Sequence, residues 1–590
     1  MRPSHFIVLD ALPLLPNGKV DRRRLPEADV VRPELETAFV PPRNLTEELL
    51  VGIWSTVLGL NQIGVYDNFF DLGGHSLLAM RLISQVRNTF QVELSLRSLF
   101  ELPTVAGLSD RIEEARQNKQ GLPIVPLVPV SREQALQLSF AQEHIWFLEE
   151  QLAPEHYFYN TASVGRFKAH LNLGALEQSL NAILQRHETL RTIFTLVEGK
   201  PVPVMAQALT LKVTVFDLQN VPKNEREAKA VQMTREEVRR PFNLASGLLL
   251  RGALLLLDEA EYILVITIHQ SAFDAWSRNV LWRELGILYQ AFSAGKPSPL
   301  TPLPIQYADF VHWQQRSLSE ERLETHLSYW KQKLAGSLPV LNLPTDYPRP
   351  PVKTFRGASQ PVSFPQHLTE ALRQLSQQEE VSMFMMYLAA YQTLLHSYTG
   401  QEDLLVGTSA DNRTRRELDG LIGCFNNYLV LRTDLSGNPS FRELLSRVRQ
   451  NTMEAYDYLD MPFSRLVPAL QLESDLSRTP LVQGMLIYKQ FLDTPTVESL
   501  DLDFTLLPFT CDWETARCDI TLTLLDVGEQ VTGFWEYSTD LFKSETISRL
   551  SEHFHNLLEK IVSDPDQHLS ELGFVINRNM PESTSLSEVF

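Results

Sequence analysis

The chain has 590 residues, of which 44% are apolar and 21% are charged. This length exceeds the roughly 100 to 200 residues of a usual domain, so we expect several globular units. The composition excludes a largely disordered or disulfide-stapled chain. The net charge of -19 repels phosphate backbones, which argues against nucleic acid as a partner.

Residues 1–42 are rich in proline and charge, and Asn17-Gly18 predicts a turn. We expect residues 1–30 to be the end of a preceding unit and residues 31–42 to be a linker. The start of the chain lacks the uninterrupted apolar stretch of a secretory signal. The apolar run at residues 248–257 contains Arg251 and is shorter than the roughly 20 residues that cross a bilayer. These features predict a cytoplasmic location without a membrane partner.

Residues 43–117 are predicted to form a small helical bundle. Asn44 is the expected N-cap of the first helix, and Glu47, three residues later, completes the pattern of a capping box. A loop leads into a second amphipathic helix from about Ser76, and two shorter apolar segments follow. The polar and proline-interrupted residues 118–130 predict an extended linker.

The remaining residues predict a large α/β unit. Its clearest elements are helices at about residues 173–190, 382–397 and 544–561, and a buried strand at residues 262–268. A proline-rich passage at residues 296–304 is expected to divide the unit into lobes. The predicted boundaries are 131–300 for the first lobe, 301–575 for the second lobe and 576–590 for a tail.

Ser76 follows two glycines and stands at the predicted start of a helix. The free N–H groups and positive dipole end of a helix favour a phosphate there, although a serine can also simply cap the helix. The surrounding DNFFDLGGHSLL closely resembles the thiolation motif of peptidyl carrier proteins. This resemblance implies a four-helix carrier bundle and a covalent 4′-phosphopantetheine on Ser76, whose thiol holds aminoacyl or peptidyl groups as thioesters.

The residues upstream, LPLLPNGKVDRRRLP, resemble the last core motif of the adenylation domains of nonribosomal peptide synthetases. In that family the lysine matching Lys19 contacts the adenylate. Some thirty residues cannot build an ATP site, so we expect Lys19 to be a solvated residue of an adenylation remnant. The chain is expected to begin within a longer module, as a misplaced start or a split gene would produce.

The large unit resembles the condensation domains of the same synthetases in a series of segments in the family's order. These are LSFAQEHIWFL with His144 where an arginine is frequent, RHETLRTIF, YADFVHW, IGCFNNYLVLR, DMPFSRLV and SDLSRTPLVQGML. The resemblance implies a two-lobed α/β fold like that of chloramphenicol acetyltransferase. It also implies amide formation between a donor thioester and the amine of an acceptor.

The expected active segment is HQSAFDA at residues 269–275, where the family pattern is H-H-x-x-x-D-G. Gln270 replaces the second histidine, and an amide can form hydrogen bonds but cannot act as a general base. Strand alternation sends His269 and Gln270 to opposite faces, so we favour an internally hydrogen-bonded histidine over a catalytic His269. Ala275 replaces the glycine and would fit poorly if the backbone there had a positive φ.

Asp274 is predicted to be structural rather than basic. A carboxylate just beyond a buried strand needs a partner, and the segment GTSADNR offers Arg413. We therefore predict an ion pair between Asp274 and Arg413 that braces the catalytic segment of His269, Gln270 and Asp274.

Other chemistries fit less well. Heterocyclization domains carry an aspartate where this chain has His269, and epimerization domains usually retain both histidines. Cys424, Cys511 and Cys518 include no C-x-x-C pair, so neither a zinc site nor a disulfide framework is predicted.

The sequence thus predicts a fragment of a nonribosomal peptide synthetase. Its expected partners are upstream and downstream synthetase modules, an acceptor carrier protein and a phosphopantetheinyl transferase. Two alternatives stay open. Gln270 and the truncated start favour a condensation-like domain without turnover, either a docking platform or the remnant of a split gene. A free-standing acyltransferase on small soluble substrates would instead work without Ser76.

Overall fold

The computed structural model describes residues 39–74, 76–90, 92, 94–117, 125–133, 135–149, 156–168, 170–206, 209–245, 247–413, 415–473, 475–490, 503–506, 514–528 and 530–573. The predicted adenylation remnant with Lys19, most of the predicted linker 31–42 and the predicted tail 576–590 lie outside these residues. The chain divides into two compact units. The first holds the described residues up to Val130 together with Pro304–Ser319 and Asp411–Leu421, and the second holds the rest.

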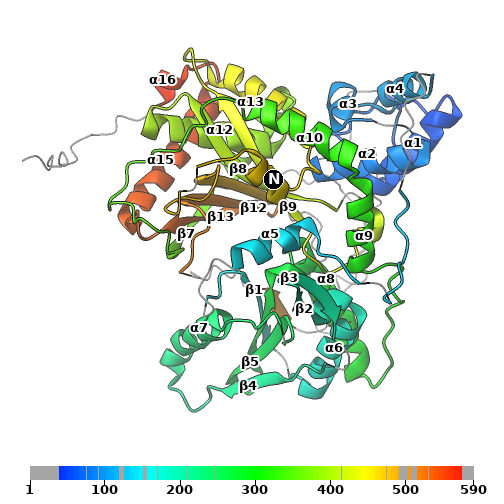
Figure 1. Cartoon of the computed structure of the whole chain (residues 1–590), viewed down its shortest axis with the longest axis vertical. Helices are drawn as coiled ribbons and strands as arrows, with labels where there is room; N and C mark the ends of the chain where they lie inside the picture. The colour runs from blue at the N-terminus through cyan, green and yellow to red at the C-terminus, as the bar shows by residue number, and fades with distance from the viewer. Residues whose placement is uncertain are drawn as a thin grey trace, which may run out of the picture. The chain divides into compact units, whose positions relative to one another are not determined.

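The first unit contains the helices predicted for residues 43–117 (Figure 1). They are α1 (Leu45–Leu58), α2 (Ser76–Phe90), α3 (Leu96–Glu101) and α4 (Val105–Gln117). The same unit also includes α9 (Tyr307–Ser317) and the short helix η4 (Arg416–Leu418), which come from later in the sequence. Apolar side chains at helical spacing meet in its core. Leu50, Trp54, Leu82, Val86 and Leu99 are fully buried there.

The start of α1 differs in one detail from the prediction. Asn44 caps the helix, and its Oδ1 accepts from the Glu47 backbone N–H at 2.8 Å. The Glu47 carboxylate does not complete a capping box with Asn44. It accepts instead from the Arg43 backbone N–H at 2.7 Å and from the Arg43 guanidinium. The arginine beside the cap outcompetes the Asn44 N–H because a charged donor makes the stronger bond.

The second unit is built on two sheets (Figure 1). Within the described residues the first sheet has the strand order β11-β1-β6-β5-β4, and the second has the order β7-β13-β12-β10-β8-β9. The strands are β1 (Asn160–Lys168), β4 (Val213–Asp217), β5 (Leu250–Asp258), β6 (Glu261–His269), β7 (Gly357–Phe364), β8 (Asp403–Asp411), β9 (Asn426–Asp434), β10 (Gly484–Gln490), β11 (Asp503–Leu506), β12 (Ile520–Asp526) and β13 (Val531–Ser538). A separate hairpin pairs β2 (Thr192–Val197) with β3 (Lys200–Met205).

Helices cover the sheets of the second unit. They are α5 (Phe140–Glu149), α6 (Leu173–Arg186), α7 (Lys223–Arg239), α8 (Ala275–Ser293), α10 (Glu320–Lys333), α11 (Gln366–Gln378), α12 (Met383–Thr399), α13 (Phe441–Asp457), α14 (Phe463–Ala469), α15 (Ser544–Ser563) and α16 (Leu569–Leu572), with short helices η2 (Glu188–Arg191) and η3 (Gln270–Ala272). Among the described residues no helix combines the length and apolarity that a bilayer crossing requires.

Strand β6 shows how the alternation of a strand builds two cores. Leu264 and Ile266 pack with α6 and α8 on one face of the first sheet. Ile263 and Val265 pack with α7 on the other face. Because successive side chains point to opposite faces, a continuous apolar run such as this one is buried on both sides. In the second sheet, Trp535 of β13 is fully buried against Tyr391 of α12 and Phe554 of α15.

The expected lobe boundary at residue 300 does not separate the two sheets. Strand β11 comes from residues 503–506, yet it pairs antiparallel with β1, with Arg166 opposite Thr505. The first sheet is therefore completed by a segment that lies more than 200 residues beyond that boundary.

Candidate active site

The loop before α2 is folded tightly around Phe69, which is fully buried against Trp54. Gly73 has a φ of +91°, and a Cβ on Gly74 would lie 2.3 Å from the Phe69 ring. Ser76 then begins α2, and His75 lies outside the described residues. The first N–H groups of a 15-residue helix lack intrahelical acceptors and favour a phosphate. This backbone fits a phosphodiester on Ser76.

His269 ends β6 and is 2% exposed. Its Nε2 lies 3.2 Å from Glu149 Oε1, and its Nδ1 lies 2.8 Å from Ser271 Oγ. The Ser271 backbone N–H also approaches Nδ1, at 3.3 Å, so Nδ1 is the acceptor and Nε2 donates to the carboxylate. Both ring nitrogens are therefore engaged in hydrogen bonds within the protein.

Glu149 binds two histidines at once. Its Oε2 lies 3.3 Å from His156 Nε2, and its Oε1 contacts His269. Burial alone would raise the pKa of Glu149, but its hydrogen bonds to the two histidines and its electrostatic interaction with them lower that pKa to about 2. Glu149 is therefore an anion at neutral pH and fixes the orientation of the His269 ring.

Gln270 follows His269 and begins the short helix η3. Its backbone N–H donates to Tyr159 O at 2.8 Å, and its side-chain Oε1 accepts from Arg517 Nη2. Arg517 reaches this position from the segment just before β12. The ends of the two sheets thus meet at a contact between side chains 247 residues apart.

Arg517 is held on several sides. Its Nη1 donates to the Tyr428 hydroxyl at 3.0 Å, and its guanidinium lies over Phe158 and Tyr159, 5.3 and 5.5 Å from the ring centroids. Burial acts to lower the pKa of Arg517, but Tyr428, Tyr159 and Glu536 together raise it. The side chain is thus a fixed cation at the base of the site.

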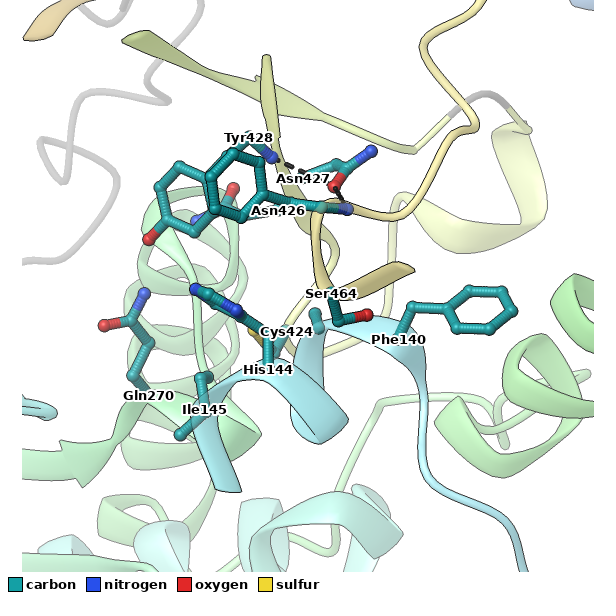
Figure 2. A pocket seen from close by; sticks show the side chains of 11 residues that line it. Phe140, His144, Ile145, Gln270, Cys424, Asn426, Asn427, Tyr428 and Ser464 are labelled. Carbon is teal, nitrogen blue, oxygen red and sulfur yellow. Dashed lines mark hydrogen bonds between the residues drawn. The ribbon is translucent and has the colours of Figure 1, made fainter. Parts of the chain in front are cut away.

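A pocket opens beside this contact (Figure 2). Gln270, His144 and Tyr428 gather around the same space in the view. The pocket has about 320 Å³ of empty space, including its opening to solvent. Its lining residues are Phe140, Ala141, His144, Ile145, Gln270, Cys424, Asn426, Asn427, Tyr428, Phe463 and Ser464. Burial, together with the charge of Arg517, lowers the pKa of His144 to about 4, so this imidazole is neutral at physiological pH.

Asp274 lies at the N-terminus of α8 and is 3% exposed. Its Oδ1 accepts from the Ser277 N–H at 2.7 Å and the Ser277 hydroxyl at 2.6 Å, and its Oδ2 accepts from the Phe425 N–H at 3.1 Å. These bonds are those of a structural N-cap. Ala275 is the first residue of α8 and does not have a positive φ, so the expected strain at this position is absent.

Arg413 belongs to the first unit, where it is 1% exposed. Its Nη1 donates to the carbonyl oxygens of Leu418 at 2.6 Å and Leu421 at 2.9 Å. These bonds fold the segment that follows β8. The ion pair between Arg413 and Asp274 stays a prediction.

Sequence reasoning missed Arg517, Glu149 and Tyr428 as parts of the site. Tyr428 stands within the segment IGCFNNYLVLR, whose resemblance to condensation domains is a signal for a site residue. Arg517 and Glu149 carry no comparable signal, because their partners are distant in the sequence.

Comparison with known proteins places these sites in a family. The model of the condensation domain matches residues 132–581, which is most of the chain. The chain belongs to the condensation-domain family. The model of the phosphopantetheine attachment site matches residues 48–112, ahead of the condensation domain, and indicates 4′-phosphopantetheine as a covalent cofactor. The chain thus carries the carrier and condensation domains of a nonribosomal peptide synthetase module.

Relatives and solved structures agree with this assignment. A linear gramicidin synthase of Brevibacillus parabrevis is 45% identical over 578 residues, 97% of this chain and 11% of that protein. Malpibaldin synthetase of Mortierella alpina is 38% identical over 97% of this chain and 10% of that protein. The chain thus spans about a tenth of the length of these relatives. The X-domain from teicoplanin biosynthesis is 26% identical with a TM-score of 0.69, over 76% of this chain and all of that structure.

Proposed function

We propose that the carrier presents an acyl group to the condensation domain, which joins it to the amine of an acceptor through an amide bond. The observation that carries this proposal is the pocket lined by His144 and Gln270, which occurs in one chain with the attachment-site loop. When bound to Ser76, 4′-phosphopantetheine would supply a thiol that holds the acyl group as a thioester. Such a domain accelerates the reaction mainly by positioning the amine and the carbonyl.

The proposed domain organisation follows from the sequence. Residues 1–30 would be the end of an adenylation domain, residues 31–42 and 118–130 would be linkers, and residues 43–117 would be a four-helix carrier. The condensation domain would take residues 131–300 and 301–575 as its lobes, with β11 returning to the first sheet. Proposed partners are neighbouring synthetase modules, an acceptor carrier protein and a phosphopantetheinyl transferase, in the cytoplasm.

The roles of the active segment differ from those of a histidine pair. Asp274 and its predicted partner Arg413 would be structural, because Asp274 already caps α8. His269 would anchor the segment through Glu149. Gln270 is the residue of this segment that lines the pocket, and its amide cannot take a proton from the amine.

The test is a transfer assay with the whole chain. A phosphopantetheinyl transferase would transfer the aminoacyl-phosphopantetheine arm of an aminoacyl coenzyme A to Ser76. An acceptor carrier that holds its own aminoacyl group would then be added. We expect a mass gain on Ser76, followed by appearance of the dipeptidyl group on the acceptor. The Ser76→Ala variant should show neither event. A mass gain without any transfer by the wild type would contradict the condensation proposal.

A second candidate is a condensation-like domain that binds a tailoring enzyme or is a remnant without turnover. Gln270 favours it, as does a 27% identity and TM-score of 0.68 to the X-domain solved in complex with OxyB from teicoplanin biosynthesis. Comparison of the wild type with Gln270→His in the same assay separates the candidates. Transfer by the wild type at a rate comparable to the variant supports condensation, and transfer by the variant alone supports the second candidate.

A further inference from the structure

The contact between Arg517 and Gln270 fixes which way the Gln270 amide faces. A guanidinium carries N–H donors and no acceptor, so only the amide oxygen of Gln270 can bind it. The amide nitrogen must then point away from Arg517. Within the described part of the chain this Nε2 donates to no protein acceptor, and Gln270 lines the pocket.

Arg517 cannot readily turn to release this arrangement. Tyr428 binds its other terminal nitrogen, and Phe158 and Tyr159 lie against the guanidinium. The Arg517 backbone N–H also donates to Glu536 Oε1 at 3.1 Å. Because side chain and backbone are both held, Gln270 is preorganised before any substrate enters.

Part of the pocket lining favours a strong hydrogen bond from the Gln270 amide. His144 faces the same space as a neutral ring, so it does not add a charge there. Phe140, Ile145 and Phe463 contribute apolar walls. A hydrogen bond in such surroundings is stronger than one in water, because fewer competing dipoles screen it.

We propose that Gln270 is a catalytic hydrogen-bond donor toward the acyl oxygen and that Arg517 is its positioning residue. This inference rests on the proposed condensation function. In the reaction the amine lone pair forms the C–N bond, the C–S bond of the donor breaks, and its electron pair leaves with sulfur. The proton lost by nitrogen passes to that sulfur, directly or through water. The acyl oxygen carries transient negative charge, and the Gln270 N–H groups would stabilise it.

The test measures single-turnover transfer from the loaded whole chain. Alanyl, leucyl and valyl groups would serve as donors on Ser76, and the matching aminoacyl N-acetylcysteamine thioesters as soluble acceptors. We expect Gln270→Leu and Arg517→Met each to slow transfer about 100-fold, the typical loss when one oxyanion donor is removed. The double variant should lose no more than either single variant, because the two residues act as one unit.

A pH profile separates positioning from a general structural role. In Gln270→His, a histidine that acts as a base would make the transfer rate fall at low pH, where the histidine is protonated. The positive charge of Arg517 would lower the pKa of this histidine. Adding Arg517→Met should move that fall in rate to higher pH, and a proton NMR titration of the same histidine should show the same shift without any turnover. A titration that does not respond to Arg517 would overturn the positioning role.

The matched control is Arg373→Met. Arg373 does not line the pocket, and its Nη2 donates to the buried Asp526 carboxylate at 2.7 Å. We expect an unchanged transfer rate. If the wild type transfers the acyl group and Arg517→Met does so as fast as Arg373→Met, the inference is overturned while the proposed function stands. Absence of transfer in the wild type and in Gln270→His alike would overturn both.

Discussion

Asp274 anchors the start of α8 through three hydrogen bonds to its carboxylate. An anion at this point also faces the positive end of the helix dipole. The residue therefore holds the start of α8 against the segment that contains Phe425. Its place on the pattern H-H-x-x-x-D-G is explained by this geometry.

Replacing Asp274 with alanine leaves the Ser277 and Phe425 N–H groups without their acceptor. We expect Asp274→Ala to lower the free energy of unfolding by about 2 to 4 kcal/mol, since buried donors lose a charged acceptor. Urea denaturation measures this loss. Ser382→Ala, which removes the cap of α12, is the matched control and should cost about 1 kcal/mol. Equal losses would show that Asp274 is an ordinary cap.

The pKa of Glu149 predicts a pH dependence of stability. Its folded pKa of about 2 lies below the ordinary value of 4.5. The lowered value means that Glu149 contributes stability above about pH 4.5 and loses it as the pH falls toward 2. We expect the stability difference between wild type and Glu149→Gln to be constant near neutrality and to shrink across that window. Denaturant titrations at pH 6, 4 and 3 measure it, and a difference that grows with acid would contradict the charge assignment.

The residues readable from the sequence were those whose partners are local. Ser76 stands within a motif of contiguous residues, and Asp274 binds Ser277 three residues later. Arg517 could not be found in this way, because Gln270 lies 247 residues before it. Tertiary packing alone decides such a pair, and neither spacing nor composition records it.

At the scale of elements, the loop before α2 is shaped by two glycines with different constraints. A side chain at Gly73 would be strained by its φ of +91°, although there is open space around it. A side chain at Gly74 would collide with the ring and carbonyl oxygen of Phe69. The loop can therefore bring Ser76 to the start of α2 only with a glycine at each position.

Gly74→Ala should disturb both the fold of the carrier and the presentation of Ser76. We expect a loss of about 2 kcal/mol in stability from the overlap with Phe69, and slower attachment of phosphopantetheine. Intact-mass time courses and thermal unfolding measure the two effects. Gly52→Ala is the matched control, because Gly52 is an exposed glycine within α1 with open space around it. It should stabilise the helix by up to about 1 kcal/mol.

The predicted elements with the longest periodic patterns agree with the structure. The helix expected at residues 382–397 is α12, and the buried strand expected at residues 262–268 lies within β6. The four-residue strand β11 was not predicted, and neither was the order of the sheets. A strand this short carries too little alternation to be recognised, and sheet order depends on contacts between distant residues.

Strand β11 joins residues 503–506 to the first sheet, which is otherwise built from residues 160–269. Alternate residues of an edge strand donate to the neighbouring strand, so replacing both Phe504 and Thr505 with proline must remove one of these bonds. We expect faster hydrogen exchange at the β1 amides of residues 165–168. Ser298→Pro, in an exposed segment without regular structure, should leave these amides unchanged. Equal exchange in all three proteins would show that β11 does not protect β1.

The return of β11 limits where synthetase genes can be recombined through this domain. A hybrid domain that takes the residues before 300 from another synthetase pairs β1 of that synthetase with β11 of this chain. The two strands must then still pair in the same register. A successful hybrid therefore needs compatible pairs at four opposing positions, from Gly165 and Leu506 to Lys168 and Asp503. Exchanging β1 and β11 together preserves the pairing between them.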